Sequence, residues 1–203
     1  MYKEIEGFMR KDILNLTIKA GAAFIVITTF FGATYYQNAE LAKELLGPYM
    51  EMLGGMVEGD GSIAWSRLFL NNVFSCAQAV GMGIVPLIFL PVFVLLSIII
   101  VTGAVLGLSM AEAGMEPVKT IVFGILPHGI FVLTGLFLSI ALGFYLCRYI
   151  TKSLLKRKQE QTILEVLNAV AKGYVTVVLP LLAIASVIEC FVTPEIMAWA
   201  GLV

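Results

Sequence analysis

The sequence has few charged residues. Asp, Glu, Lys and Arg make up only 13% of its 203 residues, whereas hydrophobic residues make up 60%; a soluble domain usually carries about 25% charge. The net charge of −1 lacks the strongly basic character that is typical of nucleic-acid binding. We therefore expect a single membrane domain over residues 1–203, without a separate soluble catalytic domain.

Residue types that support catalysis or metal binding are also scarce. The only histidine is His128, which excludes a zinc site built from paired histidines. No Walker A loop, HExxH or GxSxG motif occurs, and neither Ser75 nor Ser97 has the neighbours expected of an intramembrane serine protease. We expect no enzymatic activity, no metal and no cofactor. The three cysteines form no CxxC pair, and we interpret them as buried, inert thiols: Cys76, Cys147 and Cys190.

Long apolar runs dominate the remainder of the sequence. A membrane-spanning helix needs about 20 predominantly apolar residues, and helices that are apolar on all sides belong in lipid. The basic residues before the first run resemble a signal peptide, but no cleavage site follows, so we expect an uncleaved first span. The sequence predicts an all-α, polytopic transmembrane helical bundle of about five spans, at residues 13–36, 64–84, 87–110, 120–147 and 173–193.

The second predicted span is the most polar of the five. It contains Arg67, Asn71, Asn72 and Gln78, and glycine and proline at 81–86 separate it from the third span. A re-entrant segment is the alternative to a complete crossing.

The distribution of Lys and Arg favours five crossings with a cytoplasmic N-terminus. In this topology ten of the 13 Lys and Arg residues lie in cytoplasmic segments, as the positive-inside rule requires. Residues 37–63 then form an acidic outer loop, and residues 148–172 form a basic cytoplasmic loop with a helical pattern. The basic residues 156–158 face lipid headgroups or an acidic partner, or simply reflect the positive-inside bias.

Several polar residues fall at membrane depth, where polar groups are costly and usually face the interior of a bundle. At 1.5 Å per helical residue, they lie at a common depth in the outer half of the membrane, together with Thr28 and Thr29. This depth predicts a buried polar cluster. The cluster either forms hydrogen bonds between helices or binds a substrate, a proton or a lipid headgroup. The remaining alternative is that Glu189 simply reaches the membrane interface and belongs to no cluster. The cluster contains too few ligands for a metal: Asn71, Asn72, His128 and Glu189.

Small residues and prolines indicate where helices pack closely or loosen. Gly103 and Gly107 form a GxxxG motif in the third span, which favours close helix packing. Pro127 and Gly129 flank the histidine and should loosen the fourth helix locally. Pro180 should kink the fifth span in a similar way.

These motifs together resemble the stage II sporulation protein M family, over roughly residues 14–194. They occur in the family's order, and this sequence is closer to the wider, PHG-containing family than to the sporulation protein itself. The family's PHGxxE pattern has Val132 in place of its glutamate here, which argues against a role that needs two carboxylates, whereas Glu189 matches the late glutamate. The shared motifs are NNV at 71–73, Gly103 and Gly107, PHGIF at 127–131 and IASVIECFVTP at 184–194.

The resemblance implies a non-enzymatic, multi-spanning protein of the prokaryotic plasma membrane. The founding member resembles a membrane anchor for a peptidoglycan-degrading complex, so we expect a scaffold that binds other membrane or extracytoplasmic proteins. The alternative is a permease-like subunit of an ABC-type export or bacteriocin self-protection system, served by a separate ATPase. A second copy of the chain is a further candidate partner, beside the lipid bilayer itself.

Overall fold

The computed structural model is helical throughout the part of the chain that it describes. Those residues are 21–54, 64–87, 90–112, 114, 116–157, 159 and 161–202, and none of them forms a strand. The all-α prediction is therefore confirmed for these residues.

A long helix in the second half of the chain provides the centre of the molecule. It begins at α5 (Pro117–Lys119), widens in the π-helical turn η2 (Thr120–Ile125) and continues as α6 (Leu126–Leu154) without a break. Side chains of α6 such as Leu136 and Ser139 are fully buried. This helix contacts most of the other elements.

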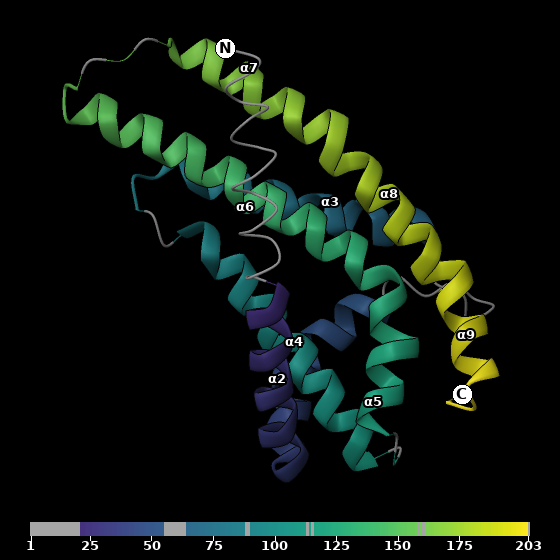
Figure 1. Ribbon diagram of the computed structural model, residues 1–203. Coiled ribbons are helices and arrows are strands. Elements are labelled where there is room, and N and C mark those ends of the chain that lie inside the picture. Colours follow the sequence, from purple (N-terminus) through teal and green to yellow (C-terminus); the bar gives the residue numbers. More distant parts are fainter. Residues whose placement is uncertain are drawn as a thin grey trace.

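A second long helix runs antiparallel to the first and ends near the C-terminus (Figure 1). It is continuous, although two π-helical turns interrupt its α-helical geometry. Its α8 segment packs against α6, and its α9 segment packs against η2. The segments are α7 (Ile163–Gly173), η3 (Tyr174–Val178), α8 (Leu179–Val187), η4 (Ile188–Val192) and α9 (Thr193–Trp199).

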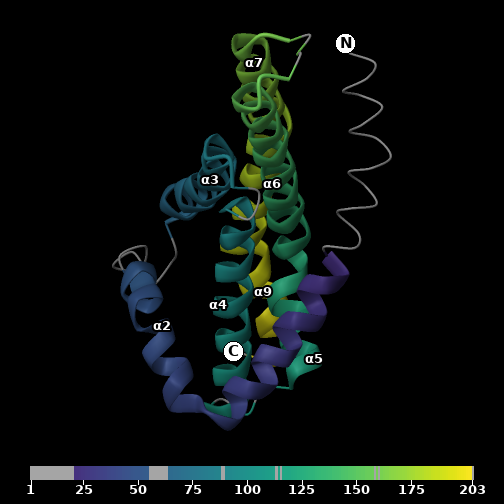
Figure 2. The same cartoon turned by 90° about the vertical axis from the view of Figure 1, so that its left-hand side faces the viewer.

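The first half of the chain surrounds this pair. A helix over residues 21–37 leads into α2, and α3 packs against α4, α6 and α8 (Figures 1 and 2). A short 3-10 turn, η1, follows α3 and also packs against α6. The bounds are α2 (Ala39–Gly54), α3 (Trp65–Gly81), η1 (Met82–Ile84) and α4 (Leu90–Glu112).

Three of the described helices are long and apolar enough to cross a membrane. They cover Leu90–Glu112, Thr120–Leu154 and Ile163–Trp199. The first is shifted by two to three residues from the predicted span 87–110, and the other two contain the predicted spans 120–147 and 173–193 and extend beyond them. The α3 helix has 17 residues, fewer than the approximately 20 that a perpendicular crossing needs. Residues 13–20 of the first predicted span lie outside the described residues. The count of five spans and the cytoplasmic N-terminus therefore remain predictions.

Close glycine contacts hold the first helix against α4. A Cβ atom on Gly103 would lie 2.6 Å from Cβ of Phe31, and one on Gly107 would lie 2.7 Å from the carbonyl oxygen of Gly32. Real Cβ atoms do not approach other atoms so closely. The GxxxG motif thus lies in the contact between α4 and the helix over residues 21–37.

The segment predicted as an outer loop contains a helix that is docked on the bundle. The buried side chains of α2 are Ala42 and Leu46, one helical turn apart, and they pack beside Ala104 of α4. Lys43 of α2 also forms ion pairs with Glu112 of α4, at 2.7 Å, and with Glu40, at 3.2 Å. The remainder of the predicted loop, residues 55–63, lies outside the described residues.

The segment predicted as a basic loop consists mainly of two helix ends. The first long helix continues to Leu154, and the second begins at Ile163 behind a capping box formed by Thr162 and Glu165. The two helices therefore form a hairpin with a short connection.

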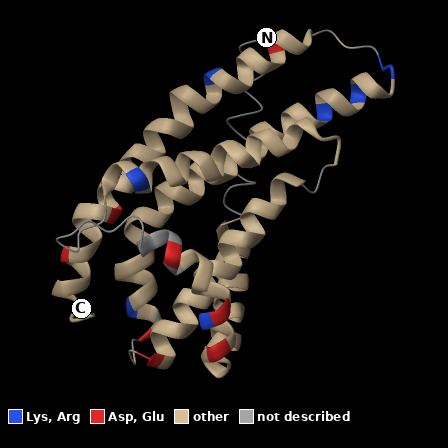
Figure 3. Cartoon of the chain, turned by 180° about the vertical axis from the view of Figure 1, so that it is seen from behind, with Lys and Arg blue, Asp and Glu red and all other residues tan. Residues whose placement is uncertain are grey.

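Charge divides the molecule into two ends (Figure 3). We call the hairpin the basic end, because most of the charged side chains there are cationic. The opposite end, which we call the acidic end, is where α2, α4 and α5 meet. The basic end carries Arg148, Lys152, Lys156, Arg157 and Lys172, and the acidic end carries Glu40, Glu44, Glu112 and Glu116 with Lys43 and Lys119.

Candidate functional site

Each π-helical turn of the long helices ends two residues before a proline. Proline has no N–H, and its ring clashes with the carbonyl four residues earlier in an α-helix. The residue before each proline instead donates its N–H to the carbonyl five residues back: Leu126 to Ile121, Leu179 to Tyr174 and Thr193 to Ile188. The sequence predicted a loosened helix at Pro127, and the structure widens the helix there without breaking it.

Two of these turns lie in the contact between the two long helices. The η2 turn of the first long helix packs against α9, which directly follows the η4 turn of the second. Pro127 and Pro194 cannot donate the usual hydrogen bonds to the carbonyls of Phe123 and Cys190. The two wide turns therefore bring backbone acceptors into the same region. π-helical turns inside α-helices are frequent at functional sites.

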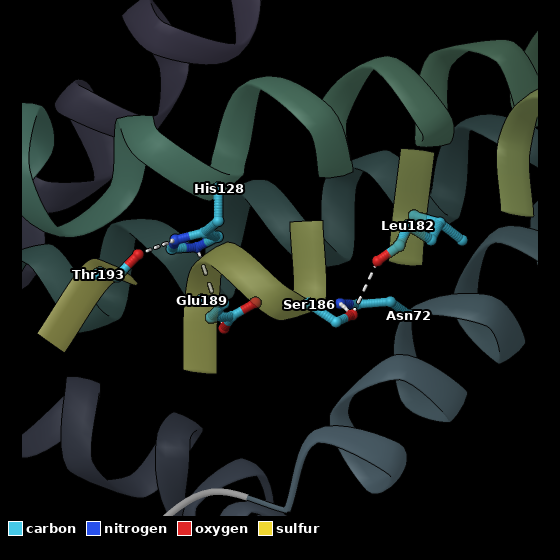
Figure 4. Close-up of polar contacts among 6 residues, drawn as sticks. All are labelled: Asn72, His128, Leu182, Ser186, Glu189 and Thr193. Atoms are coloured by element: carbon cyan, nitrogen blue, oxygen red, sulfur yellow. Dashed lines mark hydrogen bonds and ion pairs between the residues drawn. The ribbon is translucent and has the colours of Figure 1, made fainter. Parts of the chain in front are cut away.

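The histidine and the late glutamate meet at this position. His128 Nε2 lies 4.0 Å from Glu189 Oε1, and His128 Nδ1 lies 3.4 Å from Thr193 Oγ1. The side chains of His128 and Glu189 are 18% and 27% exposed, and Thr193 is buried. Figure 4 shows the ring of His128 between the two side chains of the second long helix.

A second polar contact continues along the same helix. Asn72 of α3 donates from Nδ2 to Ser186 Oγ at 3.5 Å, and Ser186 Oγ donates to the carbonyl of Leu182 at 2.9 Å (Figure 4). The neighbouring Asn71 is partly buried, and its side chain has no hydrogen bond within the described residues. Three of the four predicted polar residues thus form a row with two separate contacts along the second long helix, and Asn71 takes part in neither.

Sequence reasoning missed two members of this row, Ser186 and Thr193. Both lie in the segment 184–194, which is one of the motifs of the family resemblance. Ser186 lies three residues before Glu189 and Thr193 four residues after it, and this helical spacing could have identified them. Residues three and four positions apart share a helix face, which places Ser186, Glu189 and Thr193 on one side of the second long helix.

Helix α2 approaches the site from the other side. Burial raises the pKa of Tyr49, and the charge of Glu189 raises it further. Tyr49 therefore lies within electrostatic range of Glu189, although 140 positions separate the two in the numbering. The predicted outer segment thus contributes a side chain to the surroundings of the membrane site.

Two threonines predicted at the same depth have local roles. Thr29 donates to the carbonyl of Ile25 at 2.8 Å, and Thr28 is buried with no hydrogen-bond partner for its hydroxyl. The carbonyl of Thr28 instead faces Gly103 of α4. Thr28 therefore belongs to the contact between the first helix and α4, whereas Thr29 is exposed. Within the described residues neither forms a hydrogen bond with His128.

The site can exchange protons and hydrogen bonds. A neutral imidazole donates through one ring nitrogen and accepts through the other, so His128 can link Thr193 and Glu189. The distances exceed the roughly 2.6–3.2 Å expected for an activated nucleophile and its base. In the described part of the chain, no group of three His, Cys, Asp or Glu residues could hold a metal. The cysteines are free, with Cys76 and Cys147 buried.

A known protein family matches most of the chain. A family model described as stage II sporulation protein M matches residues 21–194, a range that includes the helix over residues 21–37, both π-helical turns of the site and all of its side chains. No curated protein and no solved structure matches the chain.

Proposed function

Because the chain belongs to the stage II sporulation protein M family, we propose that it is a non-enzymatic scaffold that anchors a membrane-associated complex in a prokaryotic cell membrane. Three apolar helices of spanning length support the membrane placement. The anchoring role follows what the family resemblance implies. Its partners are other membrane or extracytoplasmic proteins.

The observation that carries this proposal is the docked position of α2. Its apolar side is buried against α4, and its opposite side presents Glu44 and Glu51 as exposed carboxylates. Like charges fixed on one rigid face create a field that selects and steers a partner of opposite charge. A basic surface of an extracytoplasmic protein, such as a secreted hydrolase, suits this face.

A second observation favours the alternative of a permease-like transport subunit. The basic end is a capped helical hairpin with exposed Leu154, Leu155 and Leu164 beside its Lys and Arg residues. An exposed apolar and basic helix pair of this kind suits docking of an acidic cytoplasmic partner, such as a separate ATPase.

One experiment with two matched variants separates the two functions. The first variant neutralises the acidic face of α2 with Glu44→Gln and Glu51→Gln. The second neutralises the hairpin tip with Lys156→Gln and Arg157→Gln. Each variant and the unmodified chain would be cross-linked in living cells, solubilised in mild detergent, purified, and analysed for partners by mass spectrometry.

For a scaffold, we expect the unmodified chain and the hairpin variant to retain a secreted hydrolase or another extracytoplasmic protein, and the α2 variant to lose it. Recovery of an ATPase that is lost only in the hairpin variant would instead support the transport function. A chain that purifies alone, as a monomer or homo-oligomer, would contradict both.

A further inference from the structure

The ends of the two long helices beyond the site are held to each other. Phe123 of η2 and Trp199 of α9 make an edge-to-face contact with ring centroids 6.1 Å apart. Gly124 faces Met197, because a Cβ on Gly124 would lie 3.6 Å from the Met197 sulfur. We call residues 117–125 and 193–199 the paired helix ends. They can move together, since they contact each other directly.

The first paired helix end contains the wide turn η2 where it joins α6, and the second follows the wide turn η4. The η2 turn ends three residues before His128, and η4 contains Glu189 and ends directly before Thr193. A π-helical turn lacks part of the regular hydrogen bonding of an α-helix and marks a place where the helix axis can change direction. The contact between His128 and Glu189 therefore bridges the two helices where both can bend.

The charge state of this contact depends on a single proton. With one proton shared by the two groups, His128 and Glu189 form either an ion pair or a neutral hydrogen-bonded pair. Without that proton, Glu189 is an anion that faces a neutral ring in a membrane segment, where an unpaired charge is costly. Interacting groups this close bind protons as a pair rather than independently.

Few other titratable groups face the pair. Tyr49 of α2 and Cys190 of η4 interact electrostatically with Glu189. The η2 and α8 segments, which pack around the site, contain no titratable side chain. On the other neighbouring elements the titratable groups are Arg67 and Cys76 of α3, Lys119 of α5 and the exposed Glu195 of α9. Those of α6 begin at Tyr145, 17 residues beyond His128.

We propose that His128 and Glu189 form a proton-binding site, and that the bound proton keeps the paired helix ends packed as the structure shows them. Loss of the proton leaves the Glu189 carboxylate opposite a neutral ring. Water or a conformational change must then compensate its charge. The ligand of the site is thus a proton, and the response is a change at the end of the molecule that carries Trp199. This inference does not depend on the scaffold function.

The chain provides two reporters for the test. His128 is the only histidine, so ¹⁵N-histidine labelling of the full chain with a histidine-free tag reports ring protonation at this one site. The chain has two tryptophans, Trp65 and Trp199, so a Trp65→Phe background makes the emission of Trp199 specific for the paired helix ends. Both signals would be followed in lipid nanodiscs from pH 4 to pH 9.

We expect the ring of His128 and the emission of Trp199 to change with a common midpoint. Glu189→Gln removes the shared proton, so it should move the His128 midpoint by about one pH unit or more and abolish the matching emission change. His128→Gln should also abolish the emission change. The matched control Glu195→Gln alters a carboxylate of the same helix outside the pair, and it should leave both midpoints in place.

Several results would overturn the proposal. One is that, in the unmodified chain, Trp199 emission fails to change at the pH where His128 titrates. Another is a His128 midpoint that is the same in Glu189→Gln as in the unmodified chain, and a third is an emission change that is lost in Glu195→Gln and retained in Glu189→Gln. If Glu189→Gln does not fold, Glu189→Asp retains the carboxylate at a greater distance from the ring. It should shift the common midpoint, and an unchanged midpoint would count against the shared proton.

Discussion

At the scale of single residues, His128 connects the two long helices at the candidate site. Its ring nitrogens face Thr193 and Glu189, whose chemistry differs. A threonine hydroxyl can donate or accept, whereas an ionised carboxylate can only accept. Thr193 therefore suits either tautomer of the ring. This explains why a buried threonine belongs with the two titratable groups.

Glycine contacts allow a prediction at the same scale. A Cβ on Gly83 would overlap the carbonyl of Gly143 on α6, whereas a Cβ on the nearby Gly81 meets no atom within 4 Å. We expect Gly83→Ala to lower the free energy of unfolding by about 1–3 kcal/mol, because the tightly packed backbone must move. Unfolding in mild detergent, followed by circular dichroism against added denaturing detergent, measures this loss.

The matched control for this prediction is Gly81→Ala. It should be neutral or stabilising by up to about 1 kcal/mol, since alanine favours the helix and the site has room. Equal losses of stability in the two variants would show that the contact between η1 and α6 is not the cause.

At the scale of elements, the π-helical turns decide which side chains meet. A wide turn accommodates one residue more than a regular helical turn, and it rotates the side chains beyond it by about 100° relative to a regular α-helix. The direction in which α9 presents Trp199 to Phe123 therefore depends on η4. In an isolated helix, these prolines would only weaken the helix. In this molecule they set the rotation of the segment after each wide turn relative to the segment before it.

Pro194→Ala tests this role of η4. It restores a donor for the carbonyl of Cys190, so we expect the turn to revert to α-helix and Trp199 to turn away from Phe123. In the Trp65→Phe background, the Trp199 emission maximum should shift. Pro180→Ala is the control, because its turn, η3, packs against α6, α7 and α8 rather than against the paired helix ends. An identical shift in both variants, or none in either, would contradict this role.

The position of α2 is a second feature at the scale of elements. The hydrogen bonds that Lys43 donates to Glu112 and Glu40 raise the pKa of Lys43 above its ordinary value of 10.5. A raised pKa in the folded state means that Lys43 contributes stability below pH 10.5 and loses that contribution as the pH rises further. We therefore expect α2 to be held on α4 at neutral pH and to loosen above pH 10.5.

Spin labels at Gly47→Cys on α2 and Ala111→Cys on α4, in a chain whose three native cysteines are replaced, measure this effect. The distance distribution should be narrow at pH 8 and broaden above pH 10.5, and Lys43→Met should broaden it at both values. The control Lys119→Met removes a lysine that pairs with Glu116 three residues away, and it should leave the distribution narrow. A distance distribution that changes neither with pH nor with the Lys43→Met substitution would refute the prediction.

At the scale of the whole molecule, apolar composition predicted the helices because burial in lipid leaves few other structures for such runs. The docking of α2 was not predicted, since Lys43 and Glu112 are far apart in sequence and α2 is shorter than a span. The meeting of His128 and Glu189 agrees with their estimated depth. The contact with Thr193 depends on the wide turns, which periodicity alone does not reveal, although the three prolines mark their places.

The orientation in the membrane remains a prediction at this scale. If the basic end is cytoplasmic, a membrane-impermeant thiol reagent applied to intact cells should label Glu44→Cys and leave Arg157→Cys unlabelled, in a chain without its native cysteines. Both should be labelled after the membrane is permeabilised, which controls for reactivity. The reverse labelling pattern would show that the basic end is outside the cell. Labelling of both cysteine variants in intact cells would contradict the crossing of α6.

The length of the first long helix also separates the hairpin tip from the lipid. The apolar segment Thr120–Leu154 has 35 residues, whereas about 20 residues cross the hydrocarbon core. If Thr120 lies at one edge of that core and the helix is perpendicular to the bilayer, its other end extends roughly 20 Å past the core. The Debye length is about 8 Å at physiological ionic strength. Charges at the tip are therefore largely screened from the headgroup surface of their own membrane, and a protein that binds there responds to the hairpin rather than to the local lipid composition.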